Sequence, residues 1–305
     1  MQGSVMLKKK VNKWLYTKTI NFMRKQAKVK PNSINIDKYH ISYLESNHLD
    51  KPTLICIHGC DGSKDDWLML AKELKEKYHL IMIDFLGCGE STRAFEFDYA
   101  LASQALFLEK VIRKIVNEKK ITQYSLCGIS SGASLAILLA NKLPIHRLIL
   151  LNSLGIQVKL SKIDLMAKQA GSVENLPWFN ITNKHEMREM MQISFYKAPY
   201  VPNFMINHIL EQLSTNKTLS TYKFGFFYDD TMHLKDNLTD DVKKIKQKTL
   251  IVWGEEDNNI DVASAYLLEN LIENTTLKVY KKCGHLIPIE KPKELAKDIH
   301  LFLTQ

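Results

Sequence analysis

Cysteine is scarce in this sequence, and its cysteines are not paired. Five of them stand singly among 305 residues, without a C-x-x-C motif or a cluster with histidine: Cys56, Cys60, Cys88, Cys127 and Cys283. An odd number of isolated cysteines disfavours a disulfide framework, and their spacing matches no metal-binding pattern. We therefore expect a protein of a reducing compartment, the cytoplasm, without a metal site.

Acidic residues are absent from the first 36 positions, which hold nine lysines and arginines. The remaining basic residues equal the 33 acidic ones in number, so the net charge of +9 belongs to this N-terminal segment. A protein that binds nucleic acid carries a basic face on its fold. The neutral body of the chain therefore argues against nucleic acid as a partner.

Long apolar runs are also missing from this segment, since residues 7–27 contain no run of even seven apolar residues. A membrane-spanning helix needs about 20 apolar residues, so neither a span nor a cleaved signal peptide is expected. We interpret residues 1–33 as a basic helix with an imperfect apolar side. The apolar side chains are Leu7, Val11, Trp14, Leu15 and Phe22. Two interpretations stay open: a helix that lies peripherally on anionic lipid at the inner face of the membrane, and a helix that covers the protein's own core.

Short apolar runs alternate with helical patterns over residues 34–154 and 241–305. A hairpin at residues 34–37 and 40–45 comes first. Continuous apolar runs then predict buried strands at residues 53–57, 80–85, 124–127, 146–152 and 249–253, and a last strand covers 276–281. We expect an α/β fold: a mostly parallel, twisted sheet flanked by helices, with ligands bound beyond the carboxyl ends of its strands.

The alternation stops between residues 155 and 240, which are helical in pattern and rich in methionine and aromatic residues. We interpret this segment as a helical lid inserted between two strands of the core. Most of its large apolar side chains are expected to pack with one another. Their density also predicts an adaptable apolar cavity that suits an acyl chain.

The stretch Gly128-Ile129-Ser130-Ser131-Gly132 has the pattern Gly-x-Ser-x-Gly, between an apolar strand and a run of small and apolar residues. Such a turn lifts the serine Oγ clear of the sheet edge, and glycines on either side let strand and helix approach closely. The helix N-terminus points backbone N–H groups at Ser130, which favours negative charge there. By itself the pattern also fits an ordinary turn.

Two further residues make Ser130 a candidate nucleophile. A serine hydroxyl needs an imidazole as base, and the imidazole needs a carboxylate that fixes its tautomer. Asp257 and His285 each follow a predicted strand, at the same rim of the sheet as Ser130. The order Ser…Asp…His is typical of one arrangement of this triad. Glu255 and Glu256 fall earlier in the loop, where the strand end would hold them out of reach.

The oxyanion of an acyl-transfer reaction needs two N–H donors. We expect the backbone amides of Ser131, directly after the nucleophile, and of Cys60, directly after His58-Gly59. His58 is predicted to hold the loop that carries Cys60. Asp84 is predicted to stabilise the turn that follows its strand. No cofactor is implied by this chemistry.

The sequence resembles the α/β-hydrolase superfamily over residues 34–303. The resemblance lies in the blocks HGCDGSKDDW (58–67), DFLGCGES (84–91), GISSGA (128–133), VWGEED (252–257) and CGHLIPIEKP (283–292). SKDDW and the segment at residues 183–213 are similar to the monoacylglycerol-lipase-type branch and its bacterial lipase relatives. The resemblance implies a membrane-associated esterase that cleaves acylglycerols.

The sequence therefore predicts a serine carboxylic-ester hydrolase that works through an acyl-enzyme on a medium-chain lipid ester at a membrane surface. Two alternatives stay open. One is a cytosolic hydrolase of acyl thioesters or of methyl esters bound to a carrier protein, in which the basic helix meets an acidic acyl carrier protein. The other is a non-catalytic binding protein on the same fold.

Overall fold

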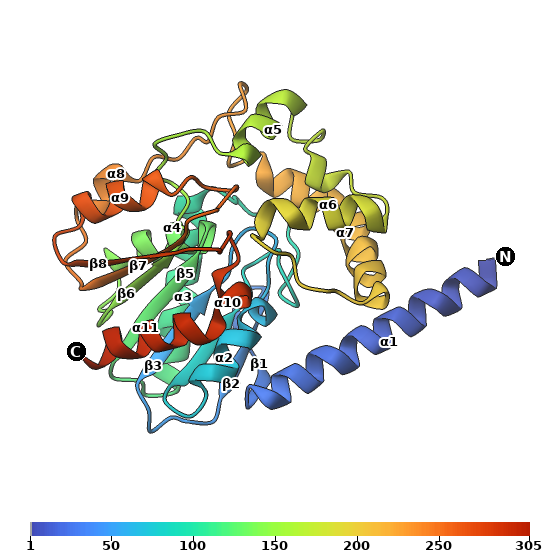
Figure 1. Ribbon diagram of the computed structural model, residues 1–305. Coiled ribbons are helices and arrows are strands. Elements are labelled where there is room, and N and C mark those ends of the chain that lie inside the picture. The colour runs from blue at the N-terminus through green and yellow to red at the C-terminus, as the bar shows by residue number, and fades with distance from the viewer. Residues whose placement is uncertain (1) are drawn as a thin grey trace.

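An eight-stranded sheet forms the centre of the computed structural model, which describes residues 2–305 (Figure 1). The strands are β1 (Val29–Ile36), β2 (Tyr39–Ser46), β3 (Thr53–Ile57), β4 (His79–Ile83), β5 (Tyr124–Ile129), β6 (Leu148–Leu151), β7 (Thr249–Gly254) and β8 (Thr275–Tyr280). Their order is β1-β2-β4-β3-β5-β6-β7-β8. β2 runs antiparallel to both of its neighbours, and the other neighbouring pairs are parallel. The expected α/β fold with a mostly parallel sheet is confirmed.

Helices cover both faces of the sheet. One face packs against α3 (Leu101–Glu118), α4 (Ser131–Ala140), α8 (Thr239–Val242) and α9 (Ala263–Leu271). The other face packs against α2 (Leu68–Leu74), which follows the short 3₁₀ helix η1 (Lys64–Trp67), and against α10 (Ile287–Glu290) and α11 (Pro292–Thr304). Every residue of β3, β4, β5, β6 and β7 is buried. Burial on both faces explains why these strands are continuous apolar runs in the sequence.

Residues 155–240, which we call the helical insert, leave the sheet after β6 and return before β7. The insert contains α5 (Lys162–Ala170), the 3₁₀ helix η2 (Pro177–Phe179), α6 (Lys184–Ser194) and α7 (Asn203–Phe224), together with the first residues of α8. Figure 1 shows α5, α6 and α7 grouped beyond one end of the sheet. The chain crosses from β6 to β7 through this group.

The N-terminal helix α1 spans Gln2–Gln26, and β1 begins at Val29. Our sequence boundary at residue 33 and our hairpin start at Ile34 were therefore placed too late. The cause is Pro31, which obscures the strand pattern although proline is tolerated at the edge of a sheet. β1 is the edge strand here.

α1 is attached to the body along one side. Near its C-terminal end, Arg24 forms two hydrogen bonds with Asp65 of η1, at 2.7 Å and 2.6 Å. Further toward the N-terminus, the ring of Tyr16 packs against His208 of α7, with centroids 4.3 Å apart. Lys9 lies 3.5 Å from Glu211 of the same helix. The helix thus contacts both the core and the helical insert.

The opposite side of α1 exposes apolar side chains. The exposed ones are Met6, Leu7, Val11, Trp14 and Phe22. With 100° per residue, four of them (all but Met6) share the outward side of the helix with Lys18 and Lys25. Among residues 2–305, no helix combines the length and the apolar character that crossing a bilayer requires.

Candidate active site

Ser130 lies in the tight turn between β5 and α4, as predicted. Its backbone has φ 57° and ψ −126°, a conformation that costs a non-glycine residue of the order of 1–3 kcal/mol. The Ser130 amide donates a hydrogen bond to Leu151 O at 3.0 Å, which ties the turn to β6. A Cβ on Gly132 would lie 2.2 Å from His58 O, and one on Gly128 would lie 2.3 Å from Gly132 O. Close approach of backbone to backbone therefore requires both glycines.

His285 and Asp257 form a buried hydrogen-bonded pair. His285 Nδ1 lies 2.8 Å from Asp257 Oδ2, and both side chains are buried. A carboxylate only accepts hydrogen bonds, so Nδ1 carries the proton and Nε2 is left with a lone pair. The other oxygen of Asp257 accepts from the amides of Asn259, at 2.7 Å, and Ile260, at 3.1 Å. These bonds fix the carboxylate in the orientation that holds the imidazole.

Ser130 and His285 line the same cavity, which has a volume of about 440 Å³. Pockets for small ligands commonly measure roughly 300–1,000 Å³. The structure thus brings together the three residues that the sequence singled out as a nucleophile, a carboxylate and a base. In the chain, α4, β6, the insert and β7 separate the first two, and α9 and β8 separate the last two. Glu255 is exposed, and the oxygens of Glu256 accept from the amides of Lys282 and Cys283.

The helical insert and the core share this cavity. Its insert side is mainly apolar and includes Ile163, Trp178, Met190, Phe224, Phe227 and Leu234. Its core side includes Ile129, Leu154, Ile260, Leu286, Pro288 and Ile289. The methionines and aromatics of the insert were expected to serve mainly as its own core, and several of them in fact line the cavity as well.

Ser131 directly follows Ser130 at the start of α4, and Cys60 lies in the loop after β3. Within residues 2–305, no hydrogen bond of the structure uses either backbone amide as its donor. Both residues line a small void of about 20 Å³ beside the main cavity, and Cys60 lines the cavity itself. Burial raises the pKa of the Cys60 thiol to about 12, so this side chain stays protonated at neutral pH.

His58 is fully buried in the loop before Cys60. Its Nε2 accepts from the amide of Phe85 at 3.1 Å, and Nδ1 donates to Gly59 O at 2.7 Å. The ring stacks on the ring of Phe85, with centroids 4.1 Å apart. Burial lowers the pKa of His58 to about 4, so the imidazole is neutral. Its contacts agree with the predicted role of holding this loop.

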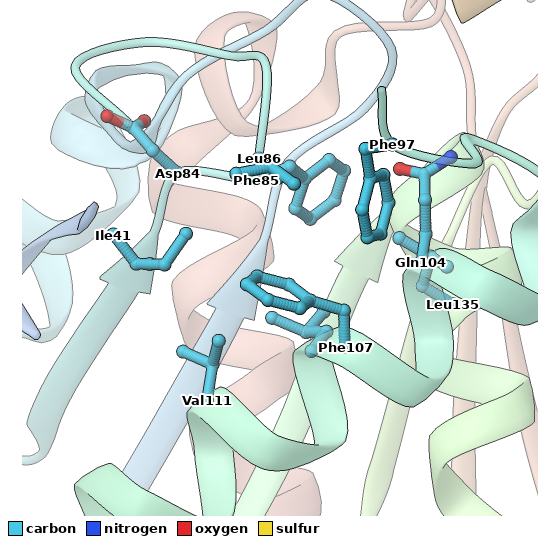
Figure 2. Close-up of a pocket in the computed structure, with 10 residues that line it drawn as sticks. Ile41, Asp84, Phe85, Leu86, Phe97, Gln104, Phe107, Val111 and Leu135 are labelled. Atoms are coloured by element: carbon cyan, nitrogen blue, oxygen red, sulfur yellow. The ribbon is translucent and has the colours of Figure 1, made fainter. Parts of the chain in front are cut away.

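Asp84 lies outside the cavity. Its carboxylate accepts from Lys64 Nζ at 2.6 Å, from the Lys64 amide at 2.7 Å and from the Glu90 amide at 2.8 Å. The bond to Glu90 fixes the turn after β4, as expected, but the buried ion pair with Lys64 was not foreseen. In Figure 2 the Asp84 carboxylate points away from the aromatic rings that line a second cavity. That cavity measures about 10 Å³, too small for a substrate.

Asn152 is a residue at this site that sequence reasoning missed. It directly follows β6 and is fully buried, with φ 42°. Its side chain donates to His285 O at 2.6 Å and accepts from the amide of Gly254 at 3.0 Å. The only available signal was a polar residue at the end of an apolar strand. Asn152 joins the end of β7 to the loop that carries His285.

Comparisons with known proteins place this architecture in a family. The model of the family described as alpha/beta hydrolase fold matches residues 52–292. The human protein named monoacylglycerol lipase ABHD6 is 28% identical over 260 residues, covering 83% of this chain and 76% of its own. Lipase 3 of Moraxella sp. (strain TA144) is 27% identical over 290 residues, covering 93% of this chain and 88% of its own.

Two crystal structures are similar over almost the full chain. A putative lipase from Acinetobacter baumannii AYE has a TM-score of 0.80 at 25% identity, covering 95% of each chain. A membrane phospholipase A, described as a bacterial virulence factor, has a TM-score of 0.86 at 24% identity, covering 96% of this chain and 92% of its own. This chain belongs to the α/β-hydrolase family and, within it, to the lipase-type branch.

Proposed function

We propose that this enzyme is a serine carboxylic-ester hydrolase that forms an acyl-enzyme on Ser130. The observation that carries the proposal is the arrangement at the cavity: Ser130 and His285 line it together, and buried Asp257 holds His285 Nδ1 at 2.8 Å. His285 Nε2 is then the nitrogen with a free lone pair. The hydrolases and lipases among the relatives support the same chemistry.

The reaction needs two steps on the same groups. Ser130 Oγ attacks the ester carbonyl carbon while His285 Nε2 takes the hydroxyl proton, and Asp257 stabilises the imidazolium. The amides of Cys60 and Ser131 bind the oxyanion. His285 then gives the proton to the departing alcohol, which leaves an acyl-Ser130 ester. In the second step water attacks this ester with His285 as base, and the carboxylic acid and free Ser130 result.

The substrate that this site supports best is an acylglycerol or another medium-chain lipid ester. The apolar wall of the cavity suits an acyl chain, and the relatives named monoacylglycerol lipase and lipase favour such esters. The outward side of α1 combines exposed apolar side chains with lysines, and this composition suits a surface of anionic lipid. We therefore place the reaction at a membrane surface, with α1 as the peripheral contact.

The catalytic part is tested by labelling with a fluorophosphonate probe and by hydrolysis of p-nitrophenyl esters of graded chain length beside monoacylglycerols. The wild type is expected to be labelled at Ser130 and to prefer medium chains. Ser130→Ala is expected to lose labelling and about 10⁴-fold or more of kcat. Full esterase activity in Ser130→Ala would refute the proposal, and an unlabelled, inactive wild type would favour a non-catalytic binding protein.

The membrane part is tested by flotation with vesicles that contain anionic lipid. Replacing the exposed Trp14 and Phe22 by serine is expected to reduce vesicle binding strongly. Tyr266→Ser is the matched control, because Tyr266 is an exposed aromatic residue of the core, away from α1. Unchanged flotation of the α1 variant would contradict a lipid contact. Binding of the wild type to an acidic acyl carrier protein but not to vesicles would favour a hydrolase of carrier-bound acyl groups.

A further inference from the structure

A lysine of the helical insert is buried beside the candidate active site. Lys223, in the last turn of α7, is only 6% exposed. Its ammonium group forms an ion pair with Asp61. It also donates to Gly87 O at 3.1 Å and lies 3.2 Å from Cys88 Sγ. One side chain of the insert therefore contacts two loops of the core.

The charge of Lys223 is retained in this position. Burial disfavours the charged form, but the neighbouring Cys88 and Asp61 outweigh this effect, and the pKa of Lys223 lies above its ordinary value. A buried ammonium is tolerated only when it is paired and hydrogen-bonded. Of the groups that Lys223 contacts, the carboxylate of Asp61 carries the negative charge that pairs with the ammonium.

Asp61 lies where its own charge affects the proposed reaction. It directly follows Cys60, whose amide we assign to the oxyanion, and it lines the cavity together with Ser130. Asp61 and Lys223 also line the small void that Cys60 and Ser131 share. The φ angle of Asp61 is 50°, so the backbone conformation of this loop is fixed at a cost.

An unpaired carboxylate at this place would oppose catalysis. The transition state of ester cleavage develops negative charge on the carbonyl oxygen, and preorganised positive dipoles stabilise it. A negative charge nearby has the opposite effect, because like charges repel, and they repel more strongly where burial lowers the effective dielectric constant. The pair of Asp61 with Lys223 removes this net charge.

Building on the proposed function, we infer that Lys223 is a positioning residue for ester hydrolysis: it neutralises the charge of Asp61 beside the oxyanion amides. Lys223 does not touch the reacting atoms. It acts through Asp61, whose charge it balances. Through Lys223 the insert thereby affects the chemical step and is not only a cover for the acyl chain.

The test compares kcat and KM for p-nitrophenyl butyrate in Lys223→Met, Asp61→Asn and the double variant. Met keeps the length of the side chain without its charge, and Asn tolerates the positive φ of residue 61. Lys223→Met is expected to lose about tenfold or more of kcat, while KM changes less than about threefold. This loss of kcat is smaller than the roughly 10²–10³-fold loss that follows removal of an oxyanion donor. Asp61→Asn is expected to lose clearly less, and the double variant to return to within about threefold of the wild type.

A purely structural role predicts a different pattern. If the ion pair only anchors the loop, then Lys223→Met and Asp61→Asn lose equal activity and the double variant recovers none of it, which would overturn the inference. Lys217→Met is the matched control, since Lys217 lies on the same helix and bonds to the neutral Asn180, and it should retain kcat. If Lys223→Met does not fold, the double variant decides: a tenfold loss of kcat in it contradicts the inference. A wild type without esterase activity would instead refute the proposed function, so the two failures are distinguishable.

Discussion

The side-chain amide of Asn152 donates a hydrogen bond of 2.6 Å to the backbone carbonyl of His285. The same side chain accepts from Gly254, the last residue of β7, three residues before Asp257. The buried side-chain amide of Asn152 therefore joins the segment that leads to Asp257 to the loop that carries His285. The Asn152 side chain makes these hydrogen bonds to backbone groups.

Replacing Asn152 by alanine is expected to lower both stability and kcat. The substitution leaves the His285 carbonyl and the Gly254 amide without their partner, and it places alanine at φ 42°. We expect a loss of about 3 kcal/mol in the free energy of unfolding. The kcat should fall by roughly tenfold, because a small displacement of catalytic groups is costly. Denaturant unfolding and ester hydrolysis measure the two effects.

Asn152→Gly separates the lost hydrogen bonds from the backbone strain. Glycine accepts the positive φ without penalty, so this variant should be more stable than Asn152→Ala by about 1 kcal/mol. Its kcat should be reduced as much as that of the alanine variant. A glycine variant with the kcat of the wild type would contradict a positioning role for the Asn152 side chain.

Asp257→Asn is expected to reduce kcat by about 10⁴-fold with little change in melting temperature. Asparagine can present its amide nitrogen to His285 and thereby stabilise the wrong tautomer of the imidazole. The rate of fluorophosphonate labelling should fall in parallel. Glu255→Gln is the control, because Glu255 is exposed at the start of the same loop. Equal losses in the two variants would remove Asp257 from its proposed role.

The sheet was predictable because burial on both faces leaves a simple signal. β3, β4, β5 and β7 were found within two residues of their ends, since each is an uninterrupted apolar run. Ser130 and Asp257 became candidates because each follows such a run, and His285 because it follows the last predicted strand; the ends of parallel strands meet at one rim. The sequence therefore indicated those residues of the candidate site that closely follow a predicted strand.

The contacts between insert and core were not predictable in the same way. Lys223 looks like an ordinary polar position of a helix, and only the folded chain brings it to Asp61. The end of α6 is also joined to the core, because the His285 amide donates to Ser194 O at 2.8 Å. Such pairs span 90 residues or more of sequence and follow no periodic pattern.

The orientation of α1 was likewise undetermined by its sequence. The apolar side chains suggested two possible partners, lipid or the core. The structure turns Trp14 and Phe22 outward, and the attachment uses Arg24 and Tyr16 instead. The Arg24–Asp65 pair spans 41 residues of sequence, so it could not be read from the pattern of α1 alone.

The stability of the protein is expected to fall between pH 6.5 and pH 4 because of His58. Its folded-state pKa is about 4, below the ordinary value of 6.5, so the unfolded chain binds a proton in this range and the folded chain does not. The loss of stability caused by His58 is absent above pH 6.5. It grows as the pH falls, to at most about 3 kcal/mol. Urea unfolding at pH 7.5 and pH 4.5 measures it.

His58→Gln should flatten this pH dependence. Its side-chain oxygen can still accept from the Phe85 amide, but it does not titrate. The variant is expected to be less stable than the wild type at pH 7.5, with a smaller loss on acidification. An unchanged slope between the two pH values would assign the acid sensitivity to other groups.

Arg24→Gln is expected to detach the C-terminal part of α1 from the core. The side chains of Arg24 and Asp65 are only 10% and 13% exposed, so the carboxylate left behind would be poorly solvated. We expect a loss of about 2 kcal/mol, between the values for exposed and for buried pairs. Glu76→Gln breaks the ion pair of Glu76 with Lys28, whose side chains are 58% and 52% exposed, and should leave the free energy of unfolding almost unchanged, because solvent screens exposed pairs. Hydrogen exchange of α1 and urea unfolding report the two effects. Equal protection of α1 in both variants would mean that the contacts of Tyr16 and Lys9 with α7, and not Arg24, hold the helix in place.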